Sequence, residues 1–176
     1  SRGFIGTPGP QRAFQLINRD NISLVVCRQQ STYNFQHALI SKCPSDICFL
    51  SSQTKETSYI IPLYIYKLEG DLFHDLERSP NLNPDYVRRF SNSIDLPFCA
   101  EKGTLEKCFT PIDILDYIYA VLHSSTYRYK YGEFLKIDFP RIPYPKSEES
   151  FFQLIQFGAE LRQIHLLESL KVNDFI

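Results

Sequence analysis

Three prolines within six residues, Pro140, Pro143 and Pro145, separate two helix-like segments near the end of the chain. Each proline fixes its own φ and restricts the residue before it, so this segment is expected to be extended and cannot continue a helix. Before it, apolar residues recur at helical spacing over 112–122, and after it the same periodicity runs over about 149–170. The sequence therefore predicts two helices joined by an extended connector, and the second helix is long.

Strand-like segments dominate the first part of the chain. Residues 22–28 are rich in β-branched side chains and follow a turn-like polar stretch, which predicts a strand. Residues 59–66 predict another strand, in which Pro62 favours an edge or a bulge because proline has no N–H to donate. The turn at 81–84 ends in a proline, a residue at which a helix could begin.

These segments predict a single α+β domain over residues 1–176. We expect a β-rich part over about 1–110 and packed, supporting helices over about 111–176. Hydrophobic residues make up 43% of the chain and charged residues 22%, the balance of a folded globular domain. No apolar run reaches the ~18 residues of a membrane span, so no membrane association is expected. The absence of an initiator Met leads us to expect a piece of a longer protein.

The cysteines are odd in number, and most lie in apolar surroundings. They are Cys27, Cys43, Cys48, Cys99 and Cys108. Because no signal segment precedes them, we expect reduced thiols in a cytoplasmic protein, each packing as a small hydrophobic residue. The spacing of Cys43 and Cys48 would suit zinc, but no second close pair of ligands exists, so no metal site is expected. An enzyme that uses a Cys–His pair stays open as an alternative.

Phosphate-binding glycine loops and the common nuclease motif are both absent from the sequence. No two of the seven glycines are separated by a single residue, and none of the nine lysines follows an Asp or Glu by two positions. We therefore expect no catalytic residue and no cofactor in this chain. His165, inside the last predicted helix, is interpreted as a packing residue. His123 closes a helix, where an imidazolium would suit the negative end of the dipole.

Charge is unevenly distributed although the net charge is only −1. Residues 1–42 carry a net charge of +4 and residues 121–146 carry +3, while 43–120 carry −5 and 147–176 carry −3. Local basic faces can bind phosphate even when the whole chain is neutral. The alternative is chance clustering on a solvated surface.

The most informative pattern spans residues 114–128 and 131–145. A helix-like run ends in Leu122-His123-Ser124, an aromatic and basic stretch follows, and Phe139-Pro140-Arg141-Ile142-Pro143 leads into the last helix. This pattern resembles the C-terminal target-recognition region of single-polypeptide (Type ISP) restriction–modification enzymes and related large adenine-N6 DNA methyltransferases. The resemblance extends over about 21–170.

The stretches 62–66 and 81–84 resemble the same family, which implies that this chain chooses the site on double-stranded DNA. The resemblance implies that the chain itself is not catalytic. Its partner would be the methyltransferase part of a bacterial, cytoplasmic parent chain that modifies adenine N6 with S-adenosylmethionine. Whether the parent also cleaves DNA stays open.

Polar side chains that follow the first predicted strand, and a polar loop at 51–57, are the candidates for sequence readout. Forked or bidentate groups such as Arg, Gln and Asn can pair with base edges, and loops on a rigid scaffold commonly carry specificity. The base-reading candidates are Arg28, Gln29, Gln30, Ser31, Thr32, Asn34, Gln53 and Lys55. The candidates for phosphate contacts, which position the protein without specifying sequence, are Arg12, Lys42, Arg128 and Lys130.

Two alternatives to this interpretation remain at the level of sequence. The polar stretches could be solvated connections of hairpins, in a protein-interaction or scaffold module that docks through the apolar face of the last helix. The alternating tyrosines at 127, 129 and 131 could form one face of a strand, with at least one of them in the core.

Overall fold

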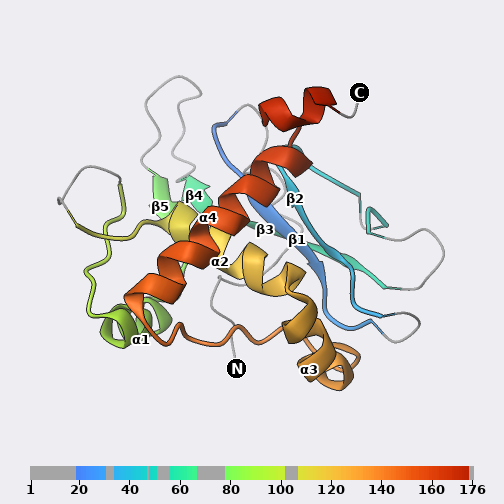
Figure 1. Cartoon of the computed structure of the whole chain (residues 1–176). Coiled ribbons are helices and arrows are strands. Elements are labelled where there is room, and N and C mark those ends of the chain that lie inside the picture. The colour runs from blue at the N-terminus through green and yellow to red at the C-terminus, as the bar shows by residue number, and fades with distance from the viewer. Residues whose placement is uncertain are drawn as a thin grey trace.

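The computed structural model describes residues 19–30, 34–46, 48–50, 56–66, 78–101 and 107–174. Two small antiparallel sheets pack with helices in a mixed arrangement, which confirms the expected α+β class (Figure 1). The strands are β1 (Ser23–Cys27), β2 (Ala38–Ser41), β3 (Ser58–Pro62), β4 (Tyr64–Tyr66) and β5 (Arg78–Pro80). The helices are α1 (Pro84–Ile94), α2 (Pro111–His123), α3 (Ser125–Leu135), α4 (Glu148–His165) and a short 3-10 helix (Leu170–Asp174).

Strand β1 is the centre of the larger sheet, whose order is β2-β1-β3. Val25 pairs with Leu39 on one side and with Ile60 on the other. All five β1 residues are buried, because both edges are paired and side chains cover the strand. The predicted strand at 22–28 is thereby confirmed, and its two ends are fixed in position.

The segment 59–66, predicted as one strand, forms two strands in different sheets. β3 lies at the edge of the larger sheet and ends at Pro62, as the missing N–H of proline predicts. After Leu63 the chain continues as β4, which among the described residues pairs with β5 alone. Asn21 joins the two sheets: its Nδ2 donates to the Tyr64 carbonyl at 2.9 Å, and its Oδ1 accepts from the Tyr64 amide at 3.1 Å.

Both helices that begin with proline are capped by the residue before it. The Asn83 side chain accepts a hydrogen bond from the amide of Asp85 at 3.0 Å, so α1 begins at Pro84 as predicted. Thr110 and Asp113 form a capping box at the start of α2. At both helix starts, therefore, the first residue is determined by adjacent residues, the proline and the capping residue before it.

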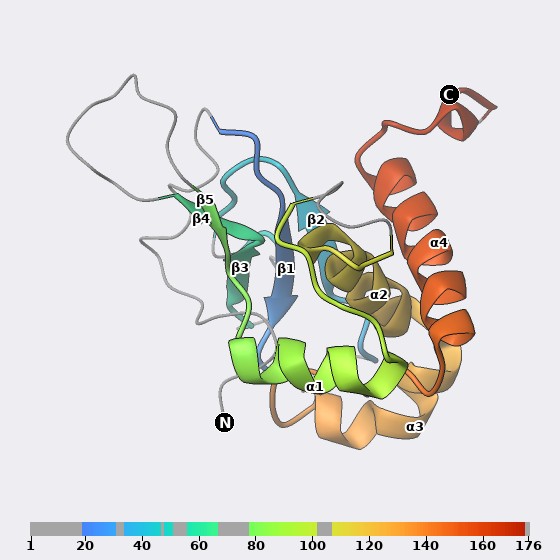
Figure 2. The ribbon, with the colours of Figure 1, turned by 90° about the vertical axis from the view of Figure 1, so that its left-hand side faces the viewer.

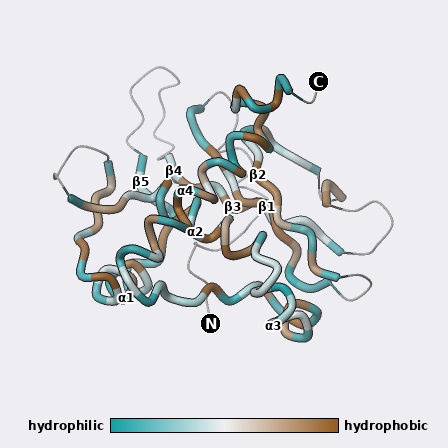
Figure 3. Tube along the Cα trace, in the orientation of Figure 1, coloured by the Kyte–Doolittle hydropathy of each residue, from teal (hydrophilic) through white to brown (hydrophobic). Residues whose placement is uncertain are grey.

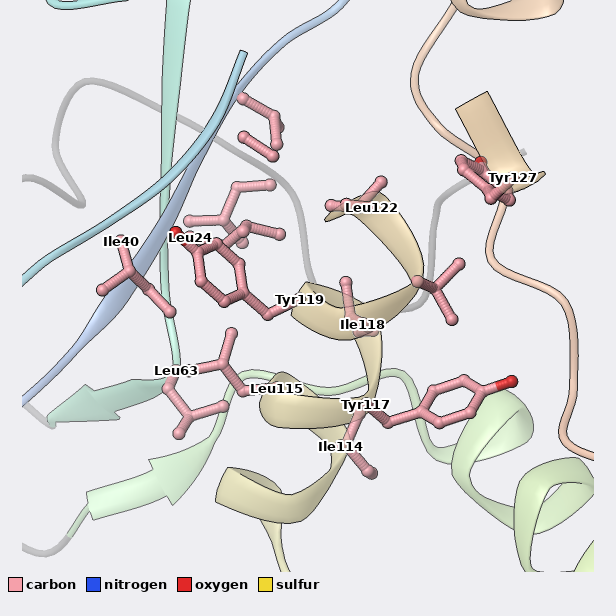
Figure 4. Close-up of a cluster of buried hydrophobic side chains, with 14 of the residues drawn as sticks. Leu24, Ile40, Leu63, Ile114, Leu115, Tyr117, Ile118, Tyr119, Leu122 and Tyr127 are labelled. Carbon is pink, nitrogen blue, oxygen red and sulfur yellow. The ribbon is translucent and has the colours of Figure 1, made fainter. Parts of the chain in front are cut away.

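Helix α2 is the core of the molecule, and ten of its thirteen residues are buried. Figure 4 shows Leu115 and Tyr119 facing Leu24 and Ile40 of the larger sheet, whereas Tyr117 points the other way, toward α1. Hydrophobic residues accordingly run along β1 and α2 (Figure 3). A helix covered on opposite sides shows less one-sided periodicity than a surface helix.

On the side of α2 away from the sheet, aromatic rings from three helices and one connecting segment meet. Phe90 of α1 lies 5.3 Å from Tyr117 of α2 and 5.1 Å from Phe151 of α4, measured between ring centroids, in edge-to-face contacts. Phe109, which precedes α2, packs 5.7 Å from Phe151. Such pairs add to the burial energy of each ring and hold α1, α2 and α4 together.

Helix α3 replaces the strand that the alternating tyrosines could have formed. The Ser124 side chain accepts a hydrogen bond from the Tyr127 amide at 3.3 Å and caps the helix. Tyr127 is buried and Tyr129 is 93% exposed. The expectation that at least one tyrosine lies in the core is therefore confirmed, and the strand interpretation is wrong.

The proline connector runs without helix or strand from the end of α3 to α4, as predicted. Buried tyrosines hold it: the hydroxyl of Tyr117 donates to the carbonyl of Pro143 at 2.9 Å, and that of Tyr127 donates to Arg141 at 3.0 Å. Helix α4 is shorter than predicted, because the chain leaves it after His165 and Leu167 takes a left-handed φ of 60°. Figure 2 shows α4 alongside α2.

Candidate nucleic-acid interface

The end of β1 presents the first group of predicted base-reading residues. Cys27 is buried, and the chain then emerges so that Arg28, Gln29 and Asn34 are exposed. Because β1 is the paired central strand, the position of its last residue is well fixed. We call residues 28–30 and 34–36 the β1 loop, of which these are the described positions.

Gln30 has a different position from its neighbours, because its side chain is only 1% exposed. Its Nε2 donates to the carbonyl of Asn34 at 2.9 Å, and its Oε1 accepts from the amide of Gln36 at 3.3 Å. Its backbone amide donates to the carbonyl of Leu135, at the end of α3, at 3.1 Å. Gln30 therefore braces the β1 loop against α3 and, as it lies here, does not reach outward to a base.

Arg28 is held by Asp138, a residue that no sequence pattern singles out. Its Nε donates to Oδ1 of Asp138 at 3.3 Å, and both side chains are more than half exposed. The two residues are 110 positions apart, so no local motif joins them. The fold alone brings the residue after β1 to the residues after α3 (Figure 2).

Helix α3 carries two of the predicted phosphate contacts, in different surroundings. Lys130 is exposed, with Nζ 5.4 Å from the centroid of the Tyr131 ring. Arg128 is only partly exposed: its Nε donates to the carbonyl of Leu122 at 2.6 Å, and Nη2 lies 3.3 Å from Nδ1 of His123. Lys130 is free to meet a phosphate, whereas Arg128 is engaged by the end of α2.

His123 is neutral, which corrects the expected imidazolium at this helix end. Burial, followed by the nearby charge of Arg128, lowers the pKa of His123 to about 4. Since Arg128 donates toward Nδ1, the proton is on Nε2, which donates to the carbonyl of Ala38 at 3.1 Å. His165 is exposed, and its Nδ1 lies 2.5 Å from the hydroxyl of the buried Tyr119, which supports the interpretation as a packing residue.

Lys42 lies apart from the β1 loop. It follows β2, whose Ser41 pairs with Ser23 at the beginning of β1. Five residues of extended chain separate Ser23 from Arg28, a distance of about 16 Å. Lys42 forms an ion pair with Glu168 near the C-terminal end. The structure therefore does not bring Lys42 and Arg28 together.

The remaining predicted site residues lie outside the described part of the chain. They are Arg12, Ser31, Thr32, Gln53 and Lys55. Ser58 pairs with Cys27, so β3 begins at the end of the sheet where β1 finishes. The two polar stretches therefore adjoin strand ends that lie side by side.

Cys27 and Cys99 are buried and Cys108 is partly exposed, but Cys43 and Cys48 are exposed, so the expectation that each cysteine packs as a small hydrophobic residue is wrong for these two. Burial raises the pKa of the Cys27 thiol to about 11, which disfavours the reactive thiolate. No group of three or more His, Cys, Asp or Glu among the described residues is placed to hold a metal ion. No helix in the described ranges is long and apolar enough to cross a membrane.

Two solved structures are similar to this chain in fold. One is an ATP-dependent Type ISP restriction-modification enzyme, LlaBIII, bound to DNA, with a TM-score of 0.62 and 20% identity over 84% of this chain. The other is a nuclease-deletion mutant of the Type ISP enzyme LlaGI in complex with a DNA substrate mimic, with a TM-score of 0.57 and 24% identity over 88%. This chain spans only 8% and 11% of those two chains.

No curated protein matches the chain in sequence at a significant level. The family model described as the Type ISP C-terminal specificity domain matches residues 1–176, which confirms the resemblance. The chain therefore belongs to the Type ISP C-terminal specificity domain family.

Proposed function

We propose that this chain reads a short sequence in double-stranded DNA, as the specificity domain of a larger Type ISP restriction–modification enzyme. The observation that carries the proposal is the β1 loop. It presents Arg28, Gln29 and Asn34 at the surface, and Gln30 braces it from beneath. Family membership and the DNA-bound state of the similar LlaBIII and LlaGI structures support the same function.

The exposed side chains of the β1 loop have the hydrogen-bonding groups that base edges require. The guanidinium of Arg28 can donate two parallel hydrogen bonds to N7 and O6 of guanine in the major groove. The amides of Gln29 and Asn34 can each donate and accept, as adenine N7 and N6 require. A braced loop loses little entropy on binding, and such preorganisation favours affinity and selectivity.

Contacts to the phosphate backbone of DNA would come from helix α3, which adjoins the β1 loop. Lys130 projects from α3 into solvent, and Gln30 ties the loop to the last turn of the same helix. A lysine placed there can neutralise a phosphate while the loop meets the bases of the same groove. With a net charge of only −1, binding would depend on such local contacts and on the rest of the parent chain.

The catalytic work would be done elsewhere in the parent chain. By resemblance to its family, we propose that the parent is a bacterial, cytoplasmic methyltransferase that transfers a methyl group from S-adenosylmethionine to adenine N6. Restriction cleavage by the same parent is the further activity that this family implies. The role of the present chain is to place that chemistry at a chosen site.

The test is selection from a pool of random duplexes, with the bound fraction sequenced against the input. The full-length protein should enrich one short motif. Combined Arg28→Ala, Gln29→Ala and Asn34→Ala substitutions should abolish the enrichment. The control is Arg88→Ala, Asn92→Ala and Gln156→Ala, which removes the same kinds of side chain from exposed positions of α1 and α4.

Three results would contradict the proposal. If the control variant loses the motif enrichment to the same extent, the β1 loop is not the part of the chain that reads the sequence. Binding without any enriched motif would leave phosphate contacts alone. No binding by the wild-type protein at low salt would favour a protein-interaction module, with exposed apolar side chains such as Phe157 as its contact surface.

A further inference from the structure

We infer that Asp138 is a positioning residue for DNA readout: it orients the Arg28 guanidinium so that Arg28 selects guanine in the major groove. This inference rests on the proposed function and assigns specificity at one base to a pair of residues. Neither the sequence pattern nor the family membership singles out Asp138. The fold alone brings the two side chains into contact.

The contact with Asp138 uses one edge of Arg28 and leaves the other available. Nε donates to Oδ1 at 3.3 Å, and the terminal Nη1 and Nη2 donate to no other group among the described residues. A guanidinium held through Nε presents its two terminal nitrogens side by side. That pair matches the adjacent acceptors N7 and O6 of guanine, whereas adenine places a donor amino group where guanine has O6.

Asp138 is itself fixed by the end of helix α3. Its backbone amide donates to the carbonyl of Phe134 at 3.2 Å. The backbone amide of Phe139, and after it the Arg28 side chain, lower the pKa of Asp138 below the ordinary value for aspartate. The carboxylate is therefore ionised at neutral pH and has a defined direction, which is what a positioning residue needs.

The two ends of the Arg28–Asp138 pair are anchored to the same strands. The ring of Phe139 packs edge-to-face on Tyr59 of β3, with centroids 5.0 Å apart. Tyr59 pairs with Val26, two residues before Arg28 in β1. The amide of Gln30 adds a hydrogen bond to α3 from the other side of Arg28. Arg28 and Asp138 are therefore held in register by β1, β3 and α3.

The Arg28–Asp138 pair contributes more to DNA recognition than to the stability of the fold. The exposed fractions of the two side chains are 59% for Arg28 and 51% for Asp138, and exposed ion pairs contribute little to stability. An arginine without a partner would sample many rotamers and would lose that freedom on meeting a base. Removal of Asp138 should leave the fold intact and change what Arg28 recognises.

The experiment uses the full-length protein and random duplexes in the selection described above, with base preference at each position as the readout. The variants are Asp138→Asn, Asp138→Ala and Arg28→Lys. The matched control is Glu133→Gln on α3, which removes one negative charge nearby from a side chain paired with Lys136 instead of Arg28. Thermal unfolding of each variant checks that the fold is retained.

The wild type should prefer guanine at one motif position, and Arg28→Lys should lose that preference because lysine cannot form the fork. Asp138→Ala should lower the same preference by about fivefold or more. Total duplex affinity should stay equal or rise, since a negative charge is removed. Asp138→Asn should have a smaller effect because its amide oxygen still accepts from Nε. Glu133→Gln should leave the preference unchanged.

Each other outcome overturns the inference. If the wild type enriches a motif and Asp138→Ala keeps every base preference, the inference fails while the proposed function stands. If Asp138→Ala and Glu133→Gln have equal effects, only the charge matters and no positioning occurs. If Arg28→Lys and Asp138→Ala change the base preference at different positions of the motif, the two residues do not act on one base. If the wild type enriches no motif, both proposals fail.

Discussion

Gly158 of α4 lies directly against the backbone of Asp116 in α2. A Cβ placed on Gly158 would be 1.9 Å from the Asp116 carbonyl oxygen and 2.5 Å from the carbonyl carbon. The two helices therefore cross at a point where no side chain separates them. One turn further along α4, Arg162 meets the Asp116 carboxylate through two hydrogen bonds of 2.6 and 3.1 Å. The close approach of the two helices at Gly158 brings Arg162 within hydrogen-bonding distance of Asp116.

Gly158→Ala is expected to destabilise the protein strongly. The added methyl group would overlap backbone atoms, which cannot rotate away, so α4 must shift from α2 at a cost of about 3 kcal/mol or more. Chemical denaturation would measure the free energy of unfolding. The control is Gly132→Ala in α3, where nothing lies within 4 Å of the added Cβ. That change should stabilise by about 0.5–1 kcal/mol, and a loss of stability there would contradict the reasoning.

Arg162→Met is expected to cost about 3–5 kcal/mol, because it leaves the Asp116 carboxylate buried without its partner. Burial already raises the pKa of Asp116, and loss of the opposing arginine would raise it further. The loss should therefore be smaller at acidic pH, where the carboxyl is neutral.

A double-mutant cycle with Asp116→Asn separates the pair from its surroundings. The double variant should be less destabilised than the sum of the single variants. Additive effects, measured by chemical denaturation, would show that the two side chains stabilise the protein independently.

The elements that the sequence predicted are those whose signals are local. β1 is a short, mostly apolar run that contains Val25 and Val26, and α1 and α2 begin at prolines with capping residues before them. The alternating tyrosines were ambiguous because spacing of two fits one strand face, whereas Tyr127 and Tyr131 also lie one helical turn apart. In α3 these two rings lie 5.0 Å apart, a contact that only the helix produces.

The candidate site could be predicted only in part, for a different reason. The exposure of Arg28 and Gln29 follows from their place after a buried strand, which the sequence indicates. The burial of Gln30 and the engagement of Arg128 depend on partners in other elements. Asp138 was missed because its partner is 110 residues away, and a lone aspartate after a helix has no distinctive signal.

His123 should make stability depend on pH between about 4 and 6.5. Its pKa is about 4 in the folded protein and near 6.5 when unfolded, so the unfolded state binds more protons in this window. Stability should therefore fall as the pH is lowered from 6.5 to 4. The slope is at most about 1 kcal/mol per pH unit, since the ring is partly screened by solvent.

Chemical denaturation at a series of pH values would measure this effect. His123→Gln keeps a donor for the Ala38 carbonyl but does not titrate, so the difference in unfolding free energy between wild type and variant should shrink as the pH falls through the window. A difference that stays constant from pH 4 to 6.5 would show that His123 is not held neutral.

Lys130 and Lys42 should differ in their effect on DNA binding, although both are exposed lysines. Lys130 lies on α3 beside the β1 loop, whereas Lys42 lies at the other end of the sheet and is paired with Glu168. Lys130→Ala should weaken binding of all duplexes alike and lower the slope of log affinity against log salt by about 1, as expected for one lost phosphate contact. The enriched motif should stay the same. Lys42→Ala should change neither the affinity nor the slope. Equal effects of the two substitutions would show that the DNA does not bind beside α3.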